Sequence, residues 1–390
     1  MYGFQLGREF KLSIAEILSV FSEAEVLYSA SSVLILNNIS ENDVLNKAKN
    51  LGGTIKIFEL ALFQDEESIL DHIISLSAGV EGKFKYSLNL FGEKNINPEN
   101  FLKKSKRTLK EKGISARYFN KDSGENLSSA QIIGNSILKK GFDLNIVDLG
   151  GIYYFGKTLW VQDIDAYSKR DYGKTRDMDI GMLPPKLAQM MINLAGDDNK
   201  SLYDPFCGLG TVLIEGIHMG IKNLFGSDFN PDMVKATKDN LYKLQSNFNF
   251  YYEVQLFDAR DMGDSDILKK NNISKIVTEG FLGEVMTKKN ISIDRINIQR
   301  NNLSKLYEKF FSGLNKVGFS GTIVISFPFW ELNGKHIYFT EIYDILDKYV
   351  NIIPIFPKEF QFKETRSGSL LYKRQSQLVG REIFKLTIKK

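Results

Sequence analysis

A glycine-containing turn between a predicted strand and a predicted helix is the feature that most limits what this chain can fold into. The turn reads DPFCGLGT and runs from Asp204 to Thr211. After Pro184 the apolar residues alternate between helical spacing and short buried runs, with short links between them. This alternation is typical of a parallel sheet that helices cover on both faces. We therefore predict a doubly wound α/β domain and expect it to contain the chemistry.

The predicted elements of this domain follow one another in a regular order, with a proline or glycine near several boundaries. Helices are expected over 185–194, 212–219 and 231–244, and strands over 201–203, 223–227, 251–257 and 274–278.

The preceding part of the chain predicts two small α+β units, over residues 1–82 and 83–166. In the first, Tyr2 to Leu6 has the pattern of a strand, and in the second, Ser128 to Lys140 has that of a helix. The polar, charged stretch after Asp165 has no apolar period and predicts a linker over 167–180. The catalytic domain then occupies 181–390.

The turn itself restricts the cofactor. Gly208 and Gly210 lack the side chains that would hold a ligand away from the backbone, and the next helix offers amide donors at its N-terminus. A dinucleotide site would have a third glycine, and a phosphate-binding loop would end in Gly-Lys-Ser/Thr, but the sequence continues Thr211-Val-Leu. NAD and ATP are therefore disfavoured. S-adenosylmethionine, which has a nucleoside and a charged amino-acid end, matches the turn.

Three aspartates end successive predicted strands and complete this hypothesis. Asp204 is placed to receive an ammonium group, and Asp228, at 228 − 208 = 20 positions after the first glycine, to hold a ribose diol. Asp258 is placed to accept a hydrogen bond from an adenine amine. The alternative for each aspartate alone is that it caps a helix or closes a turn.

Cysteine and histidine are too rare for several other classes of protein. One Cys and three His exclude a disulfide framework and make a structural metal site improbable, so we expect no metal and a reducing cytoplasmic location. The net charge of +4 permits an anionic partner, and no apolar run is long enough to span a membrane. The single cysteine, Cys207, lies inside the glycine turn, which argues against base C5 methylation and predicts a packing role.

Longer motifs resemble a known family. GMLPPKLAQMMINLA (181–195) followed by DPFCGLGT resembles class I methyltransferases that act on exocyclic base amines, particularly the THUMP-containing tRNA guanine-N2 methyltransferases. LGREFKLSIAEI (6–17), NLSSAQIIGNSI (126–137) and GKTLWVQDIDAYSKRDY (156–172) resemble the family's ferredoxin-like and THUMP segments, and LYKRQSQLVGREIFKL (371–386) resembles its final hairpin.

The resemblance covers most of the chain and implies a Rossmann-like methyltransferase domain after two α+β units, a ferredoxin-like one over 1–82 and a THUMP-like RNA-binding one over 83–166. It implies S-adenosylmethionine as methyl donor and tRNA or another structured RNA as partner. The expected cofactor-binding residues are Pro184, Asp204, Phe206, Gly208, Gly210, Thr211, Asp228, Phe229, Asp258 and Ala259.

The acceptor motif of this family, usually Asp-Pro-Pro-Tyr or Asn-Pro-Pro-Tyr, corresponds here to Glu279, Gly280 and Phe281. The lone pair of an exocyclic amine is delocalised into the ring, so an acceptor and a backbone carbonyl must orient it while an aromatic ring stacks the base. Glu279 keeps the acceptor and Phe281 the ring, whereas Gly280 replaces a proline and is expected to loosen the loop. The alternative is an ordinary strand end and turn.

Two basic stretches are candidates for RNA contacts. The first is a helical stripe and the second lies in the linker, and the alternative for both is a solvated surface. They comprise Lys103, Lys106, Arg107 and Lys110, and Lys169, Arg170, Lys174 and Arg176.

The leading hypothesis is an S-adenosylmethionine-dependent methyltransferase that modifies the N2 amine of a guanosine in tRNA. One rival is a DNA amino-methyltransferase acting on adenine N6 or cytosine N4. The other is an RNA-binding homologue whose catalysis is weakened by Gly280.

Overall fold

The computed structural model describes residues 1–93, 96–120, 126–172, 183–196, 200–356, 360, 365, 367–375 and 377–389. The chain divides into two compact units. The first comprises Met1–Ile14, Phe21–Lys49 and Gly53–Ala166, and the second comprises Ala15–Val20, Asn50–Gly52 and Tyr167–Lys390.

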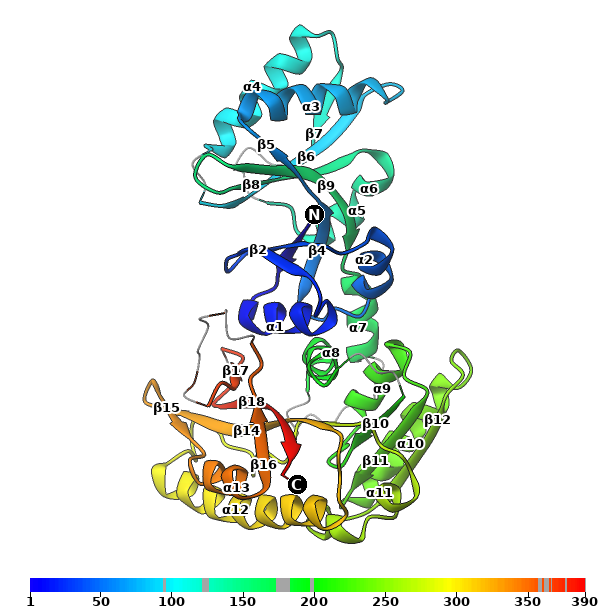
Figure 1. The fold of residues 1–390 in the computed structure, drawn as a ribbon, viewed down its shortest axis with the longest axis vertical. Coiled ribbons are helices and arrows are strands. Elements are labelled where there is room, and N and C mark those ends of the chain that lie inside the picture. Colours follow the sequence, from blue (N-terminus) through cyan, green and yellow to red (C-terminus); the bar gives the residue numbers. More distant parts are fainter. Residues whose placement is uncertain are drawn as a thin grey trace. The chain divides into compact units, whose positions relative to one another are not determined.

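The strands of the first unit form one sheet in the order β2-β3-β1-β4-β9-β8-β6-β7, with β5 paired to the beginning of β9 (Figure 1). Because β4 and β9 are antiparallel neighbours, strands from 1–82 and from 83–166 share this sheet. The boundary predicted at residue 82 stays a prediction about folding units. The strands are β1 Tyr2–Leu6, β2 Glu25–Ser29, β3 Val33–Asn37, β4 Thr54–Glu59, β5 Ala61–Phe63, β6 Phe84–Gly92, β7 Ala116–Tyr118, β8 Phe142–Asp148 and β9 Tyr153–Val161.

Six helices lie among the described residues before residue 141. The continuous helix predicted over 128–140 is wrong, because the chain forms two short helices there. Ser136 adopts a left-handed conformation with φ of 52°, which interrupts the helical backbone. The helices are α1 Phe10–Val20, α2 Glu41–Ala48, α3 Glu66–Ala78, α4 Pro98–Glu111, α5 Ser129–Gly134 and α6 Ile137–Lys140.

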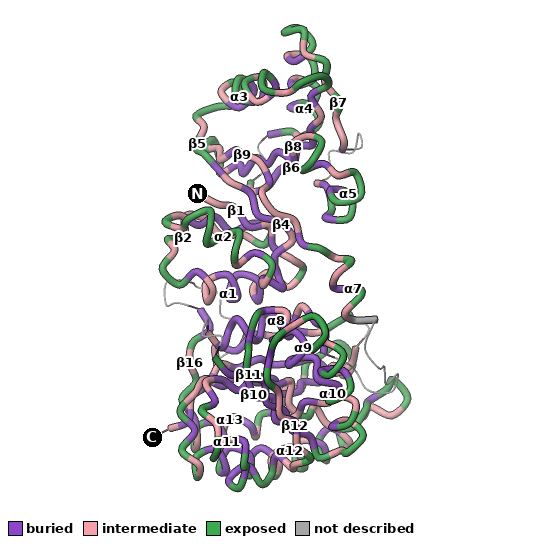
Figure 2. The backbone as a smooth tube through the Cα atoms, turned by 90° about the vertical axis from the view of Figure 1, so that its right-hand side faces the viewer, coloured by how far each residue is buried: buried purple, intermediate pink, exposed green. Residues whose placement is uncertain are grey.

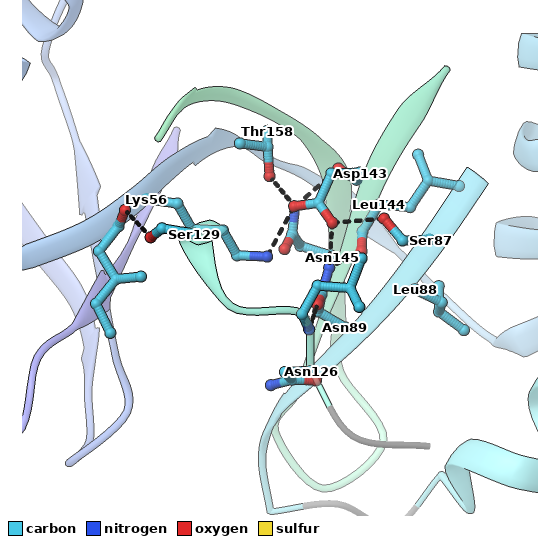
Figure 3. A network of polar contacts seen from close by, with 12 residues as sticks. Lys56, Ser87, Leu88, Asn89, Asn126, Ser129, Asp143, Leu144, Asn145 and Thr158 are labelled. Carbon is cyan, nitrogen blue, oxygen red and sulfur yellow. Dashed lines mark hydrogen bonds and ion pairs between the residues drawn. The ribbon is translucent and has the colours of Figure 1, made fainter. Parts of the chain in front are cut away.

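A buried ion pair joins four strands in the middle of this sheet (Figure 3). Lys56 Nζ of β4 lies 2.8 Å from Asp143 Oδ2 of β8, and both side chains are fully buried. Thr158 of β9 donates to the same oxygen at 2.6 Å. Ser87 and Asn89 of β6 donate to Asp143 Oδ1 at 2.6 and 2.8 Å. Every oxygen of this carboxylate therefore has at least two partners.

The second unit contains a sheet in the order β12-β11-β10-β13-β14-β18-β16. The first five strands of this order are parallel, and β18 is antiparallel to both β14 and β16. β15 pairs with β14, and β17 pairs with β18. The strands are β10 Ser201–Asp204, β11 Asn223–Asp228, β12 Tyr251–Leu256, β13 Lys275–Thr278, β14 Thr322–Leu332, β15 Lys335–Tyr338, β16 Val350–Ile353, β17 Leu370–Tyr372 and β18 Val379–Ile388.

Side chains of these strands alternate between the two faces of the sheet. Leu202 and Leu224 lie against Gly216, where an added Cβ would approach their methyl carbons to 2.8 and 3.0 Å. Tyr203, the next residue on β10, belongs instead to a core cluster with Tyr307. Helices thus cover both faces, and the predicted doubly wound sheet is confirmed; β10 and β11 are almost wholly buried (Figure 2).

The three helices predicted in this unit agree with the structure: 185–194 and 231–244 are reproduced to the residue, and 212–219 begins and ends one residue earlier. α7 extends to Tyr172, so the linker predicted over 167–180 begins within a helix, and its bounds stay a prediction. Residues 173–182, with Lys174, Arg176 and Gly181, lie outside the described residues. None of the described helices is long and apolar enough to cross a membrane. The helices are α7 Ile164–Tyr172, α8 Pro185–Leu194, α9 Thr211–His218, α10 Pro231–Leu244, η1 Ala259–Asp264, α11 Asp266–Lys270, α12 Ile293–Lys316 and α13 Glu341–Tyr349.

Candidate active site

The glycine turn lies where the strand order of the second sheet reverses. β10 pairs with β11 on one side and with β13 on the other, and ligands of doubly wound sheets bind at the carboxyl ends of the strands at such a point. Gly208 and Gly210 both adopt left-handed φ, of 50° and 81°. A Cβ on Gly210 would lie 2.9 Å from Thr237 Cγ2, whereas one on Gly208 would meet nothing within 4 Å. Gly210 is therefore required for packing, and Gly208 leaves an open approach.

Asp228 ties the turn to the next strand. Its carboxylate accepts from the backbone N–H groups of Gly208 at 2.9 Å and Asn230 at 3.0 Å. Burial raises the pKa of this carboxyl, although those hydrogen bonds oppose the shift. Asp228 therefore fixes the glycine turn, which is the alternative weighed for it, and its contact with a ribose stays a prediction.

Asp204 is the most deeply buried acid of the site. It is 2% exposed and accepts from Phe206 N–H at 3.2 Å. Burial raises its pKa to about 7, with the charges of Asp228 and Glu279 adding to the shift. A cationic group beside Asp204 would offset the free-energy cost of ionising this buried carboxyl. The ammonium of S-adenosylmethionine is such a group, so the acids present fit the expected cofactor.

A small cavity of about 80 Å³ adjoins Asp204 and joins five of the predicted site residues. Leu183, Cys207, Leu209, Val212 and Met233 complete its lining, and none of these five was predicted as a cofactor-binding or catalytic residue. Its volume is well below the ~300–1,000 Å³ of drug-sized ligand sites, so it holds only part of a nucleoside cofactor. The predicted residues that line it are Asp204, Phe206, Gly208, Thr211 and Glu279.

Cys207 has the packing role that its position predicts. It is 4% exposed, and its thiol lies 3.8 Å from the hydroxyl of Thr237. Burial raises the pKa of this thiol well above its usual value, so it is not a reactive thiolate.

The remaining predicted cofactor residues lie outside the small cavity. Pro184 and Ala259 are buried, and Phe229 is 66% exposed immediately after β11. Asp258 follows β12, but Arg260 Nε lies 3.0 Å from both of its carboxylate oxygens, and this ion pair lowers the pKa of Asp258. An adenine amine would have to share those oxygens with Arg260, so the assigned role of Asp258 stays a prediction.

A larger cavity of about 400 Å³ shares Glu279 with the smaller one. It is lined by the loop after β13 and by the beginning of β18, and it includes all three predicted catalytic residues, Glu279, Gly280 and Phe281. Phe281 is 40% exposed and offers an accessible ring. Glu279 borders both cavities and therefore lies between the glycine turn and the larger space.

Gly280 does not loosen this loop as the sequence suggested. Its φ is 71°, a conformation closed to proline, and an added Cβ would lie 2.6 Å from Tyr307 Oη. Ser326 Oγ donates to the Glu279 carbonyl at 2.5 Å, and Tyr307 Oη to the Phe281 carbonyl at 2.8 Å. The loop is anchored at two carbonyls on either side of Gly280, so side-chain hydroxyls replace the rigidity that proline would give.

Arg381, which the sequence analysis did not single out, contacts the predicted acceptor residue Glu279. It forms an ion pair with Glu279, and the two side chains are 3% and 20% exposed. Arg381 Nη1 also donates to Gln377 Oε1 at 3.3 Å. The available signal was an Arg-Glu pair, Arg381 and Glu382, inside a strand that is otherwise mostly apolar.

Many of the predicted basic RNA contacts already have partners. On α4, Lys103 pairs with Glu99 at 2.6 Å, and Lys106 lies 4.9 Å above the ring of Tyr118. Arg170 pairs with the buried Glu215 at 3.1 Å. These contacts favour the alternative of a structural or solvated role for those residues. Within the described parts, no cluster of three or more His, Cys, Asp or Glu is arranged to hold a metal.

Comparison with known proteins identifies the class to which this site is similar. Residues 173–328 match the family described as RMKL-like, methyltransferase domain. The matched range is less than half of the chain, but it contains the glycine turn, the three strand-end aspartates and Glu279. The resemblance to methyltransferases drawn from the motifs is thus confirmed over the site, and the fold is the Rossmann-like sheet expected for the class I enzymes.

Two proteins that are similar in sequence to this chain have the same name. The chain is 27% identical over 211 residues to the tRNA (guanine(10)-N2)-dimethyltransferase of Pyrococcus abyssi, covering 51% of this chain and 57% of that protein. It is 40% identical over 85 residues to the enzyme of the same name from Methanothermobacter thermautotrophicus, covering 21% and 24%. The chain therefore aligns with between a quarter and somewhat over half the length of these relatives.

A solved structure aligns over a longer range at low identity. The crystal structure of TrmN from Thermus thermophilus covers 100% of this chain and 99% of its own, with 14% identity and a TM-score of 0.47.

Proposed function

We propose that this protein is an S-adenosylmethionine-dependent methyltransferase that transfers methyl groups to the exocyclic N2 amine of a guanosine in tRNA. The observation that carries the proposal is the position of Glu279, which borders both the cavity beside the glycine turn and the larger cavity beside Phe281. A methyl donor in the first and a base in the second would meet at this carboxylate. The tRNA substrate rests on the names of the relatives.

On the cofactor side, Asp204 would hold the amino-acid end and Asp228 the ribose, while Gly208 admits the chain of the ligand. S-adenosylmethionine, when bound, supplies a methyl group activated by its sulfonium. The buried carboxylates around the turn favour a cationic ligand, because each positive charge offsets the cost of keeping them ionised away from water.

On the acceptor side, Glu279 would accept a hydrogen bond from the amine and Phe281 would stack the everted base. The Gly280 carbonyl receives no hydrogen bond from the described residues, so it offers a second acceptor for the amine. These contacts turn the amine lone pair out of conjugation with the ring, and much of the rate would come from this positioning. The anchored loop keeps both acceptors in place.

The first unit would bind the RNA. Its ferredoxin-like and THUMP-like segments motivate this assignment, and a tRNA-modifying enzyme with one unpaired cysteine would work in the reducing cytoplasm. On α4, Lys110 remains for phosphate contacts, since Lys103 and Arg107 pair with acids of the same helix.

The test is methyl transfer to unmodified tRNA, followed by mass spectrometry of the nucleosides. We expect N2-methylguanosine, and loss of the product when Glu279 is replaced in the Glu279→Ala variant. Glu308→Gln, which changes a carboxylate of α12 that pairs with Lys348 of α13, is the matched control and should retain activity.

Methylated adenine or cytosine in a DNA digest would instead identify a DNA amino-methyltransferase. Tight S-adenosylmethionine binding in calorimetry without transfer to any nucleic acid would identify a weakened RNA-binding homologue. Either result would overturn the proposed function.

A further inference from the structure

The ion pair between Glu279 and Arg381 connects the candidate acceptor loop to the last strand of the chain. Arg381 lies on β18, paired with Pro328 of β14 on one side and with Tyr372 of β17 on the other. Its guanidinium carbon is 5.9 Å from the Tyr372 ring, and Nη1 donates to Gln377. These contacts hold the guanidinium in one orientation.

The ion pair uses only one oxygen of the carboxylate. Arg381 Nε donates to Glu279 Oε1. Glu279 Oε2 receives no hydrogen bond from the described residues, and it is not among their buried, unpartnered polar atoms. Because Glu279 lines both cavities, this second oxygen is the acceptor that remains for a ligand.

The protonation state of Glu279 decides whether it accepts or donates. An ionised carboxylate accepts N–H donors with both oxygens, whereas a protonated one presents an O–H toward the amine. Burial raises the pKa of Glu279, and Arg381 opposes this shift by its charge and its hydrogen bond. Arg374 opposes it by charge alone.

Other charged groups also surround this carboxylate. Asp204 faces it from the smaller cavity, and Glu284 and Lys288 line the larger one. Tyr307, on α12, is buried nearby; burial raises its pKa, and the charge of Glu279 adds a smaller contribution. Of the cationic residues Lys288, Arg374 and Arg381, Arg381 is the one that forms an ion pair with Glu279.

We propose that Arg381 is a positioning residue of the methyl transfer, which keeps Glu279 ionised and turns its Oε2 toward the acceptor amine. The inference rests on the proposed function, in which Glu279 orients that amine. Arg381 acts through Glu279 and leaves cofactor binding to the glycine turn. Its position 102 residues further along the chain makes the C-terminal hairpin part of the acceptor site.

The pH dependence of turnover tests this role. In Arg381→Met, the acid limb of the kcat profile should move upward by about 1–3 pH units, the range by which an adjacent opposite charge shifts a carboxyl pKa. The KM for S-adenosylmethionine should change less than about twofold, because the glycine turn is untouched. Arg381→Lys restores the charge without the planar fork and should recover part of the shift.

Arg374→Met is the matched control, since it removes an arginine that influences Glu279 by charge alone, and its shift should be smaller. In a Glu279→Gln background, Arg381→Met should cause no further loss, because the two residues act through one group. An unchanged acid limb in Arg381→Met, or losses that add to those of Glu279→Gln, would overturn the proposal.

A titration of the ¹³C-labelled Glu279 carboxyl separates this inference from the proposed function. A higher pKa in Arg381→Met than in the parent protein supports the electrostatic role even if no RNA is methylated. Equal pKa values in a folded variant would refute it, whatever the activity of the parent protein.

Discussion

Two buried ion pairs, one in each unit, differ in how completely their carboxylates are occupied. Lys56 and Asp143 are both 0% exposed, and hydroxyl and amide donors fill the remaining sites of the carboxylate. Arg381 is 3% and Glu279 is 20% exposed, and one oxygen of Glu279 has no protein partner in the described structure. We call the Lys56–Asp143 pair closed, because protein groups occupy both carboxylate oxygens, and the Arg381–Glu279 pair open, because Glu279 lines two cavities.

The difference separates two uses of a buried charge. A fully partnered pair fixes how strands associate, because any unpaired alternative leaves a charge away from water. A partly buried carboxylate with one unpartnered oxygen still carries part of the free-energy cost of leaving water. A ligand that donates a hydrogen bond to that oxygen offsets this cost. The unfilled acceptor, rather than burial itself, distinguishes the proposed chemical role of Glu279 from the structural role of Asp143.

Removing the cation of the closed pair should have the largest effect. Lys56→Met leaves Asp143 buried and unpaired, so the first unit should lose about 3–5 kcal/mol of unfolding free energy. Urea unfolding followed by emission of Trp160, on β9, measures this loss, while Trp330, on β14, reports the second unit.

The matched control for that experiment is Lys157→Met, which breaks the half-exposed pair with Glu59 in the same sheet. It should cost less than about 1 kcal/mol. Equal losses for the two substitutions would show that closure of the Lys56 pair has no special value.

The open pair should behave in the opposite way. Glu279→Gln preserves the shape of the side chain but weakens its acceptor and its bond to Arg381, so methyl transfer should fall about a hundredfold or more. The unfolding free energy should fall by less than in Lys56→Met, because the amide oxygen still accepts from Arg381 and the site opens on cavities. A large loss of stability with unchanged activity would place Glu279 with the structural acids and break the comparison.

The sequence predicted the parts of the molecule that depend on local pattern. The turn after β10 and the helix over 231–244 follow from spacing, glycine and proline, which act over a few residues. The pairing of Glu279 with Arg381 depends on β18 lying beside β14, a contact between segments far apart in the chain that no local period encodes. The effect of Gly280 was misjudged for the same reason, since its support comes from Ser326 and Tyr307 on other elements.

Asp204 provides a test of the cofactor side that depends on pH. Its pKa is raised to about 7 by burial, so its ionised form, which attracts an ammonium, predominates only above that pH. S-adenosylmethionine affinity should therefore be about tenfold weaker at pH 6 than well above pH 7. Titration calorimetry across this range measures the change, and Asp204→Asn should abolish the dependence.

The raised pKa of Asp204 also makes the unfolding free energy depend on pH in a defined direction. Between the unfolded value of 3.8 and the folded value of about 7, the folded protein binds the extra proton. The contribution of Asp204 to stability is therefore lost as the pH rises through this window. Without ligand, Asp204→Asn should gain stability relative to the parent protein as the pH increases from about 4 to about 7. A difference that is constant with pH would contradict the burial of an ionisable Asp204.

The smallest expected effect concerns the loop that carries Glu279. Gly280 and Gly318 have similar left-handed φ, of 71° and 66°, but an added Cβ meets Tyr307 Oη at 2.6 Å only at Gly280, and nothing within 4 Å at Gly318. Alanine at either position incurs the left-handed strain of about 1–2 kcal/mol. Gly280→Ala should cost about 1 kcal/mol more than Gly318→Ala, because the hydroxyl that anchors the loop must move. Thermal unfolding of the two variants measures this difference, and equal values would mean that Tyr307 does not hold the acceptor loop in place.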